Sequence, residues 1–175
     1  MLRVMNSYTR TVGASSLLDA AIGVAKKEVG VCEVPPGSNR GPRVEEYLKS
    51  VGLGGGYAWC AAFVYWSFNQ ASLSLNRVNP LVKTAGCLQH WRATRGFKVA
   101  AGDVVKMSSL IVPGAIFIIN RGGGLGHTGI VTSIDEGFIQ TVEGNTNADH
   151  SAEGGGVCAL KRKIESINVG FILYS

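Results

Sequence analysis

Hydrophobic residues follow two different patterns in the two halves of the chain. At 16–29 they recur three and four positions apart, which predicts an amphipathic helix with Lys26, Lys27 and Glu28 facing water. Further helices are expected at 42–50, 57–71 and 82–94. The second half instead has short β-rich runs separated by glycines, and strands are expected at 115–119, 128–134, 138–142, 156–161 and 169–174.

This order of elements predicts an α+β domain. Helices come first and antiparallel strands follow, so N-terminal helices should pack on a small twisted antiparallel sheet. The sequence contains no internal repeat and no sign of a second domain. We expect residues 1–14 to form a flexible N-terminus and residues 15–175 to form a single domain.

The predicted helix at 57–71 is apolar on nearly every side, so it should lie buried in the middle of the domain. Three glycines at 54–56 precede it, and Cys60 falls in its first turn. The first N–H groups of a helix are unpaired and the helix dipole is positive there, so a thiol ionises more easily and an oxyanion can be bound. The competing interpretation is that Cys60 is a small buried hydrophobic residue.

Composition and charge restrict the partners. The net charge of +5 suits an anionic partner, such as nucleic acid, a membrane or a bacterial cell wall. Basic runs are short and no aromatic residues alternate with them, so nucleic-acid binding is not expected. The sequence has neither a signal-peptide core nor an apolar run of about 18 residues. It therefore predicts a soluble protein made in the cytoplasm, with no membrane insertion.

The cysteines do not form a metal site or a disulfide framework by their spacing. They stand at Cys32, Cys60, Cys87 and Cys158, and we expect reduced thiols. Cys87 and His90 could face a metal from one side of a helix, but no second pair of ligands accompanies them. We expect no metal and no cofactor.

A nucleophilic cysteine requires a base, and His127 is the best placed histidine. It opens a predicted strand and shares a face with Gly129, whose missing side chain leaves room for the imidazole to reach a neighbouring helix or substrate. The next strand leads into Glu143 and Asn145, and either can accept the second ring N–H as a catalytic triad requires. A purely structural histidine at a strand end is the alternative.

With Cys60, His127 and the strand end that carries Glu143 and Asn145, the sequence resembles the CHAP family. Its members are the cysteine, histidine-dependent amidohydrolases and peptidases of bacterial cell-wall metabolism. The matching motifs lie at 57–64, 126–131 and 142–146, and the resemblance extends over about 16–174. It implies a single catalytic domain with a papain-like fold. It also implies that Cys60 is the nucleophile and that His127 is the general base and then the general acid. Glu143 would be the orienting acid and Asn145 a fourth polar member of the site.

Two positions depart from the family pattern. Many relatives carry an acidic residue where this chain has Ala115, and some carry an oxyanion-stabilising glutamine where it has Trp59. The backbone N–H of Cys60 is therefore the better candidate for the oxyanion hole. Tyr57 and Trp59 are predicted to contact substrate.

The resemblance implies a peptidoglycan hydrolase that cuts an amide bond, as an N-acetylmuramoyl-L-alanine amidase or a peptide endopeptidase. A phage endolysin or a secreted antibacterial effector would reach the wall after release or delivery, with peptidoglycan as partner and an immunity protein or delivery apparatus as further partners. One alternative is a non-catalytic wall-binding or structural module of a phage tail or secretion apparatus. Another is a cytoplasmic cysteine protease.

Overall fold

The computed structural model describes residues 16–147 and 154–174, so the expectation for residues 1–14 lies outside the described part of the chain. The helices are α1 (Leu17–Lys27), α2 (Pro42–Ser50), α3 (Cys60–Ser74), α4 (Cys87–Ala93) and α5 (Ala101–Lys106), with short 3-10 turns at η1 (Ser108–Leu110) and η2 (Ile164–Ser166). The strands are β1 (Phe97–Ala100), β2 (Ile116–Gly122), β3 (Leu125–Asp135), β4 (Phe138–Thr146), β5 (Gly156–Lys163) and β6 (Gly170–Leu173).

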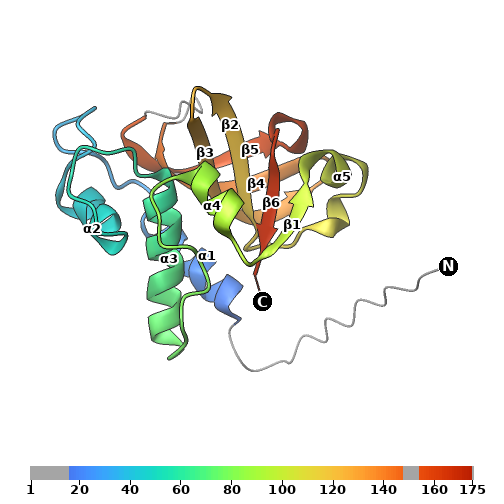
Figure 1. The fold of residues 1–175 in the computed structure, drawn as a ribbon, viewed down its shortest axis with the longest axis horizontal. Coiled ribbons are helices and arrows are strands. Elements are labelled where there is room, and N and C mark those ends of the chain that lie inside the picture. Colours follow the sequence, from blue (N-terminus) through green and yellow to red (C-terminus); the bar gives the residue numbers. More distant parts are fainter. Residues whose placement is uncertain (1–15, 148–153, 175) are drawn as a thin grey trace.

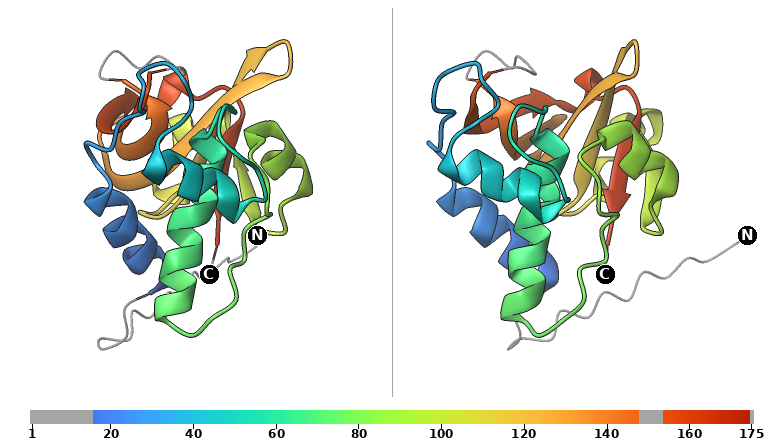
Figure 2. Two further views of the ribbon diagram at one scale, coloured as in Figure 1. Left: turned by 90° about the vertical axis from the view of Figure 1, so that its left-hand side faces the viewer. Right: turned by 60° about the vertical axis from the view of Figure 1, so that its left-hand side comes forward.

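All six strands belong to one antiparallel sheet with the order β1-β6-β2-β3-β4-β5. Helices α1, α2 and α3 lie together on one side of the molecule, beside the sheet (Figure 1). The turn between β2 and β3 projects beyond the body of the molecule (Figure 2). This arrangement confirms the predicted α+β class.

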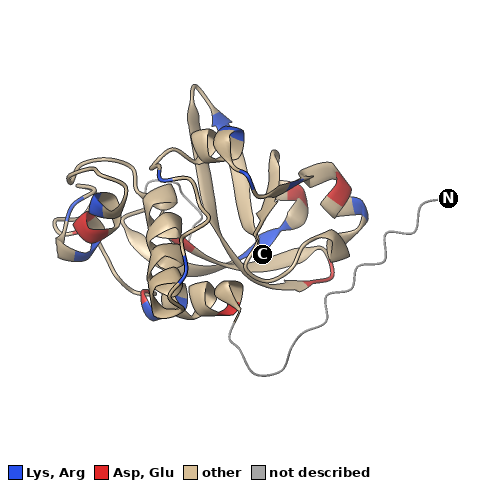
Figure 3. Ribbon diagram, turned by 60° about the horizontal axis from the view of Figure 1, so that its bottom comes forward, with Lys and Arg blue, Asp and Glu red and all other residues tan. Residues whose placement is uncertain are grey.

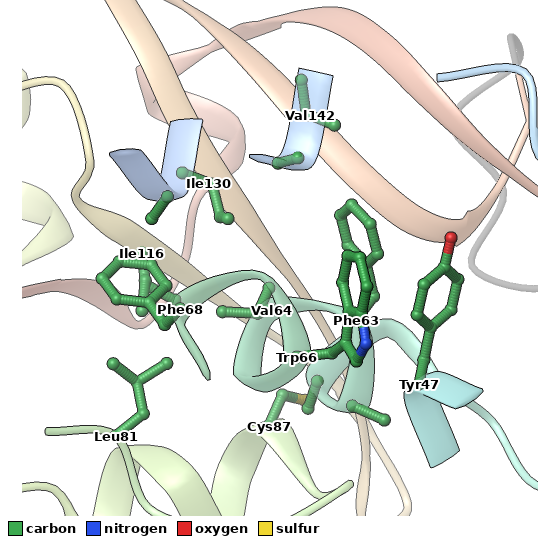
Figure 4. Close-up of a cluster of buried hydrophobic side chains, with 14 of the residues drawn as sticks. Tyr47, Phe63, Val64, Trp66, Phe68, Leu81, Cys87, Ile116, Ile130 and Val142 are labelled. Carbon is green, nitrogen blue, oxygen red and sulfur yellow. The ribbon is translucent and has the colours of Figure 1, made fainter. Parts of the chain in front are cut away.

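Helix α3 is the central helix of the fold. Its residues are apolar on almost every side because it packs against α1, α2 and the sheet at once. Figure 4 shows the side chains of Phe63 and Trp66 near Tyr47 of α2, with Ile130 and Val142 of the sheet across from them. The N-terminus of α3 is thereby held firmly against the sheet.

The opposite face of the sheet carries a second core. Along β2, Ile116 and Ile118 belong to the core under the helices, whereas Phe117 and Ile119 belong to the second core, as strand alternation requires. Residues of α5 and η2 close this second core. The sheet is therefore buried on both faces near its middle, and polar groups placed there must find partners within the protein.

The helix predicted at 82–94 is shorter than expected, because α4 begins only at Cys87. The Thr84 hydroxyl accepts a hydrogen bond from the Gly86 N–H at 3.0 Å, and Gly86 has extended backbone angles. Such a local side-chain bond competes with helix formation. The structure also adds β1 and α5, two short elements that the hydrophobic pattern did not predict.

The prediction that Glu28 faces water is wrong. Glu28 is buried, and its carboxylate accepts hydrogen bonds from Arg43 Nε at 2.7 Å and from the Tyr47 hydroxyl at 2.5 Å. The hydrogen bond from Arg43 outweighs the effect of burial and lowers the pKa of Glu28. This carboxylate therefore joins α1 to α2.

Among the described residues, no helix has the length and hydrophobicity needed to cross a bilayer.

Candidate active site

Cys60 is the first residue of α3, as the sequence predicted for the first turn of the central helix. Its position leaves the first N–H groups of the helix without intrahelical acceptors. Hydrogen bonds from the Ala61 and Thr128 amides favour the thiolate form of Cys60. The sulfur thus lies beside the backbone of the residue that follows His127.

The sheet makes room for the helix end at this point. Strands β3 and β4 pair from Asp135 opposite Phe138 up to Ile130 opposite Val142, and β4 then stays paired with β5 through a register shift between Glu143 and Thr146. Gly144, just beyond, lies so close to α3 that a Cβ placed on it would be 2.7 Å from Trp59 and Phe63 atoms. The end of β4 therefore packs directly beneath the start of α3.

The imidazole of His127 contacts the carboxylate of Glu143, as predicted. His127 Nε2 lies 2.7 Å from Glu143 Oε2, and both side chains are fully buried. An ionised carboxylate can only accept, so the ring must carry its proton on Nε2. This leaves the lone pair on Nδ1, and Nδ1 has no hydrogen-bond partner within the described residues.

The space over Gly129 is used differently from the prediction. An ideal Cβ on Gly129 would lie 2.7 Å from Glu143 Cγ and 2.8 Å from Phe117 Cε1. Glu143 and Phe117 fill this space, so it does not serve as a path for the imidazole toward the helix. The glycine instead lets the Glu143 side chain cross β3 and reach the His127 ring on the same face.

Four donors surround the Glu143 carboxylate. Oε1 accepts from the Thr141 hydroxyl and from Arg162 Nε, both at 2.5 Å, and Oε2 accepts from Arg162 Nη2 at 2.6 Å and from His127. Burial alone would raise the pKa of Glu143, but the hydrogen bonds from Arg162 and His127 lower it to about 2. The carboxylate is therefore ionised at neutral pH although no part of it reaches solvent.

The Cys60 thiol contacts Cys87 rather than His127 in this structure. Cys87 begins α4, and its thiol lies close enough to the Cys60 thiol to affect its pKa. Interaction with Cys87, and then burial, raise the pKa of Cys60 well above its ordinary value. Interaction with Cys60 lowers the pKa of Cys87, although burial acts in the opposite direction. No hydrogen bond joins the Cys60 thiol to the His127 ring in the part of the chain that the structure describes. All four cysteines are free.

Asn145 is buried near the same strand end, with a left-handed backbone at φ 55°. Its Oδ1 has no hydrogen-bond partner among the described residues. Because Glu143 already occupies His127 Nε2, Asn145 is not the group that orients the imidazole here. Of the two candidates left open by the sequence, Glu143 is the one that contacts the imidazole in this structure.

The two residues expected to contact substrate differ in exposure. Trp59 is fully buried in this structure, and its indole N–H donates to Glu33 Oε1 at 2.9 Å, which links the start of α3 to the segment between α1 and α2. Tyr57 is 56% exposed and remains available to a ligand. Ala115 is buried in the second core, where an acidic residue would need a partner.

The other polar residues of interest have structural partners. His90 Nε2 lies 2.7 Å from the Tyr174 hydroxyl, so it faces the C-terminal strand and not Cys87 in a shared metal site. Within the described ranges, no group of three or more His, Cys, Asp or Glu side chains is arranged to hold a metal ion.

Sequence reasoning missed Arg162 and the role of Cys87. Arg162 lies 19 residues after Glu143, on the neighbouring strand β5. Side chains two residues apart on a strand share a face, so Arg162 lies on the same buried face as Leu160. A charged residue at a buried strand position is a signal for a buried partner, and that signal was available. Cys87 gave no such signal, because its approach to Cys60 depends on how α4 packs.

The comparison with protein families agrees with these observations. The family model described as CHAP domain matches residues 52–145, which is more than half of the 175-residue chain. The matched region contains Cys60, His127, Glu143 and Asn145. No curated protein and no solved structure matches the chain. On the strength of this match and of the His127–Glu143 pair beside the start of α3, the chain belongs to the CHAP family.

Proposed function

We propose that this protein hydrolyses an amide bond of bacterial peptidoglycan, with Cys60 as nucleophile, His127 as general base and Glu143 as the orienting acid. Membership of the CHAP family supports a peptidoglycan hydrolase or amidase type of function. The observation that carries the assignment is the buried His127–Glu143 pair. Nδ1 of His127 has no partner among the described residues, and the amide of the next residue, Thr128, contacts the Cys60 thiol.

The proposed reaction follows from the tautomer of His127. Nδ1 takes the proton of Cys60, and the thiolate attacks the carbonyl carbon of the amide. The tetrahedral oxyanion is stabilised by the backbone N–H groups at the start of α3. His127 then gives the proton to the leaving amine, and water hydrolyses the thioester to regenerate the thiol.

Two changes must precede this reaction. Cys60 is only 5% exposed and His127 is fully buried, so the site must open for a substrate to enter. The thiol must also exchange its contact with Cys87 for one with Nδ1. A buried ring nitrogen without a partner is costly, which favours a contact that satisfies it.

The closed site also gives support to a second candidate function. A wall-binding or structural module of a phage tail or secretion apparatus would need no access to Cys60, and the burial of the site is compatible with it. Retention of the complete Cys60, His127 and Glu143 set favours the enzyme. Sedimentation with purified walls, without release of fragments, would support the module instead.

The decisive experiment compares four single variants, Cys32→Ala, Cys60→Ala, Cys87→Ala and Cys158→Ala, for the loss of turbidity of purified cell walls. Cys60→Ala should abolish lysis, because loss of a nucleophile costs several orders of magnitude in rate. Its free energy of unfolding should change by only about 1 kcal/mol, since alanine is the better helix former. A Cys60→Ala protein that melts normally and still clears the suspension would overturn the proposal.

Mass spectrometry of the released fragments then identifies the bond that is cut. A free muramic acid lactyl group indicates the amidase, and a shortened stem peptide indicates the endopeptidase. Parallel reactions with EDTA should keep their activity and reactions with iodoacetamide should lose it, because the proposed nucleophile is a side chain. Action after release as an endolysin, or after delivery as an antibacterial effector, is part of the proposal.

A further inference from the structure

We infer that Arg162 is a positioning residue that determines which nitrogen of His127 acts as the base, by keeping Glu143 in the form that only accepts hydrogen bonds. Its effect on turnover rests on the proposed function, whereas its effect on the His127 ring can be measured without any wall hydrolysis.

Arg162 holds both oxygens of Glu143 at once. Nε donates to Oε1 at 2.5 Å and Nη2 donates to Oε2 at 2.6 Å, which is the two-point geometry that suits guanidinium and carboxylate groups. Arg162 is 7% exposed and Glu143 is fully buried. The guanidinium carbon lies 5.5 Å from the centre of the Phe117 ring, which confines it from another direction.

Glu143 needs this cation to remain charged. A carboxylate buried away from solvent becomes protonated unless a charge and several donors compensate it. Of the groups that contact Glu143, Arg162 alone is permanently charged among the described residues, since Thr141 is neutral and His127 is charged only when protonated. Cys158 lies opposite Glu143 in the β4–β5 register, but its thiol donates to the Thr146 carbonyl oxygen.

A change in the charge of Glu143 would change the imidazole. While Glu143 is ionised, His127 Nε2 must donate, and Nδ1 keeps the lone pair that can take a proton from Cys60. A protonated Glu143 could donate to Nε2, and the ring proton would then move to Nδ1. In that tautomer the nitrogen available to the nucleophile cannot act as a base.

The test measures the ring ¹⁵N chemical shifts of His127 in the wild type and in Arg162→Met, with the signals assigned by their loss in His127→Gln. The wild type should show a protonated Nε2 and an unprotonated Nδ1 at neutral pH. Arg162→Met should move His127 toward the opposite tautomer and lower kcat for wall hydrolysis by about 10²-fold or more with little change in KM. In a comparable triad the wrong tautomer costs about 10⁴-fold.

Two further variants separate charge from structure. Arg162→Lys keeps the positive charge and should keep the wild-type tautomer, with an intermediate kcat. Arg162→Gln keeps a donor without the charge and should behave as Arg162→Met, so it serves if the methionine variant does not fold. The matched control is Arg43→Met, because Arg43 also donates two hydrogen bonds to one carboxylate, that of Glu28, from Nε and Nη2 at 2.7 Å.

Arg43→Met should lower stability without changing the His127 tautomer. If Arg162→Met and Arg162→Gln keep the wild-type tautomer and kcat, Arg162 is merely structural and the inference is overturned. If the tautomer changes with Arg162 but the wild type releases no wall fragments, the inference stands and the proposed function falls. The two ideas therefore fail by different measurements.

Discussion

Gly129 illustrates how much the site depends on single residues. An added Cβ would lie 2.7 Å from Glu143 Cγ, 2.8 Å from Phe117 Cε1 and 3.0 Å from the Val142 carbonyl oxygen, and the last of these cannot rotate away. The carboxylate that contacts His127 passes directly over this position. One methyl group is therefore enough to displace Glu143 from the imidazole.

Gly129→Ala should lower wall hydrolysis and also destabilise the fold by about 1–3 kcal/mol, the usual range for overpacking. Thermal melts and turbidity assays measure the two effects. The control is Gly23→Ala in α1, where nothing lies within 4 Å of the added Cβ. That substitution should stabilise the protein by about 0.5–1 kcal/mol, because alanine is favoured over glycine in a helix. Equal behaviour of the two variants would contradict the role given to Gly129.

We expect Cys87 to reduce the reactivity of Cys60 in the closed structure. The interaction with Cys87 is the largest of the effects that raise the pKa of the Cys60 thiol. Cys87→Ala should therefore lower the pKa of Cys60 and increase its thiolate fraction at neutral pH, and iodoacetamide should alkylate Cys60 faster. Peptide mapping by mass spectrometry follows this rate at Cys60 alone. Cys158→Ala is the control and should leave the rate unchanged; a slower reaction in Cys87→Ala would refute the prediction.

At the level of whole elements, local sequence signals predicted some boundaries well. Helix α2 occupies the predicted range, because Pro42 is favoured at a helix start and Gly52 adopts φ +88° just after its end. Helix α3 begins three residues later than the predicted start at Tyr57, and Trp59 outside it bonds Glu33, 26 residues away. Such long-range contacts cannot be predicted from spacing.

The same distinction applies to the candidate site. His127 and Glu143 were predicted to lie close together because the start of one strand lies beside the end of the next in a hairpin. The exact contact was not predictable, because the β3–β4 pairing ends at Ile130 opposite Val142 and Glu143 reaches the imidazole over Gly129. The contact between Cys60 and Cys87 depends on the packing of α4, and the burial of Trp59 depends on the loop around Glu33. Packing between elements is the part that one sequence does not provide.

Trp59 fixes the loop before α3, and its replacement tests this structural role. Glu33 is buried, and it also accepts from the Asn39 N–H at 3.0 Å. Trp59→Phe removes the indole donor and should lower the free energy of unfolding by about 1–3 kcal/mol, because a buried acceptor loses a partner. KM for purified walls should not change. The control Trp91→Phe, at a partly buried position, should lower the free energy of unfolding by less. A rise in KM of Trp59→Phe with normal stability would instead indicate that Trp59 contacts substrate.

Across the whole molecule, His90 links stability to pH. It joins α4 to the C-terminal Tyr174 hydroxyl, and burial lowers its pKa to about 4 from 6.5. The folded state therefore disfavours protonated His90. The contribution of neutral His90 to the free energy of unfolding is complete above about pH 6.5 and is lost as the pH falls toward 4. This loss amounts to roughly 3 kcal/mol.

The midpoint of thermal unfolding should accordingly decline between pH 6.5 and 4.5. Glu28 and Glu143 have lowered pKa values, so their contributions are lost only at lower pH. His90→Gln can still bond Tyr174 and should flatten the decline. Parallel curves for the wild type and His90→Gln in this window would show that another group is responsible.

The buried pair of Arg162 and Glu143 has a consequence for ionic strength. Its two charges cancel inside the protein, where mobile ions have little access. The net charge of +5 is instead carried by the other charged residues of the sequence. In the described part of the chain, Lys, Arg, Asp and Glu are spread over helices, strand ends and loops (Figure 3). Added salt weakens attraction to an anionic wall while leaving the internal pair almost untouched. A salt titration thus separates binding to the wall from the catalytic step. KM should rise steeply with salt, and kcat should stay nearly constant.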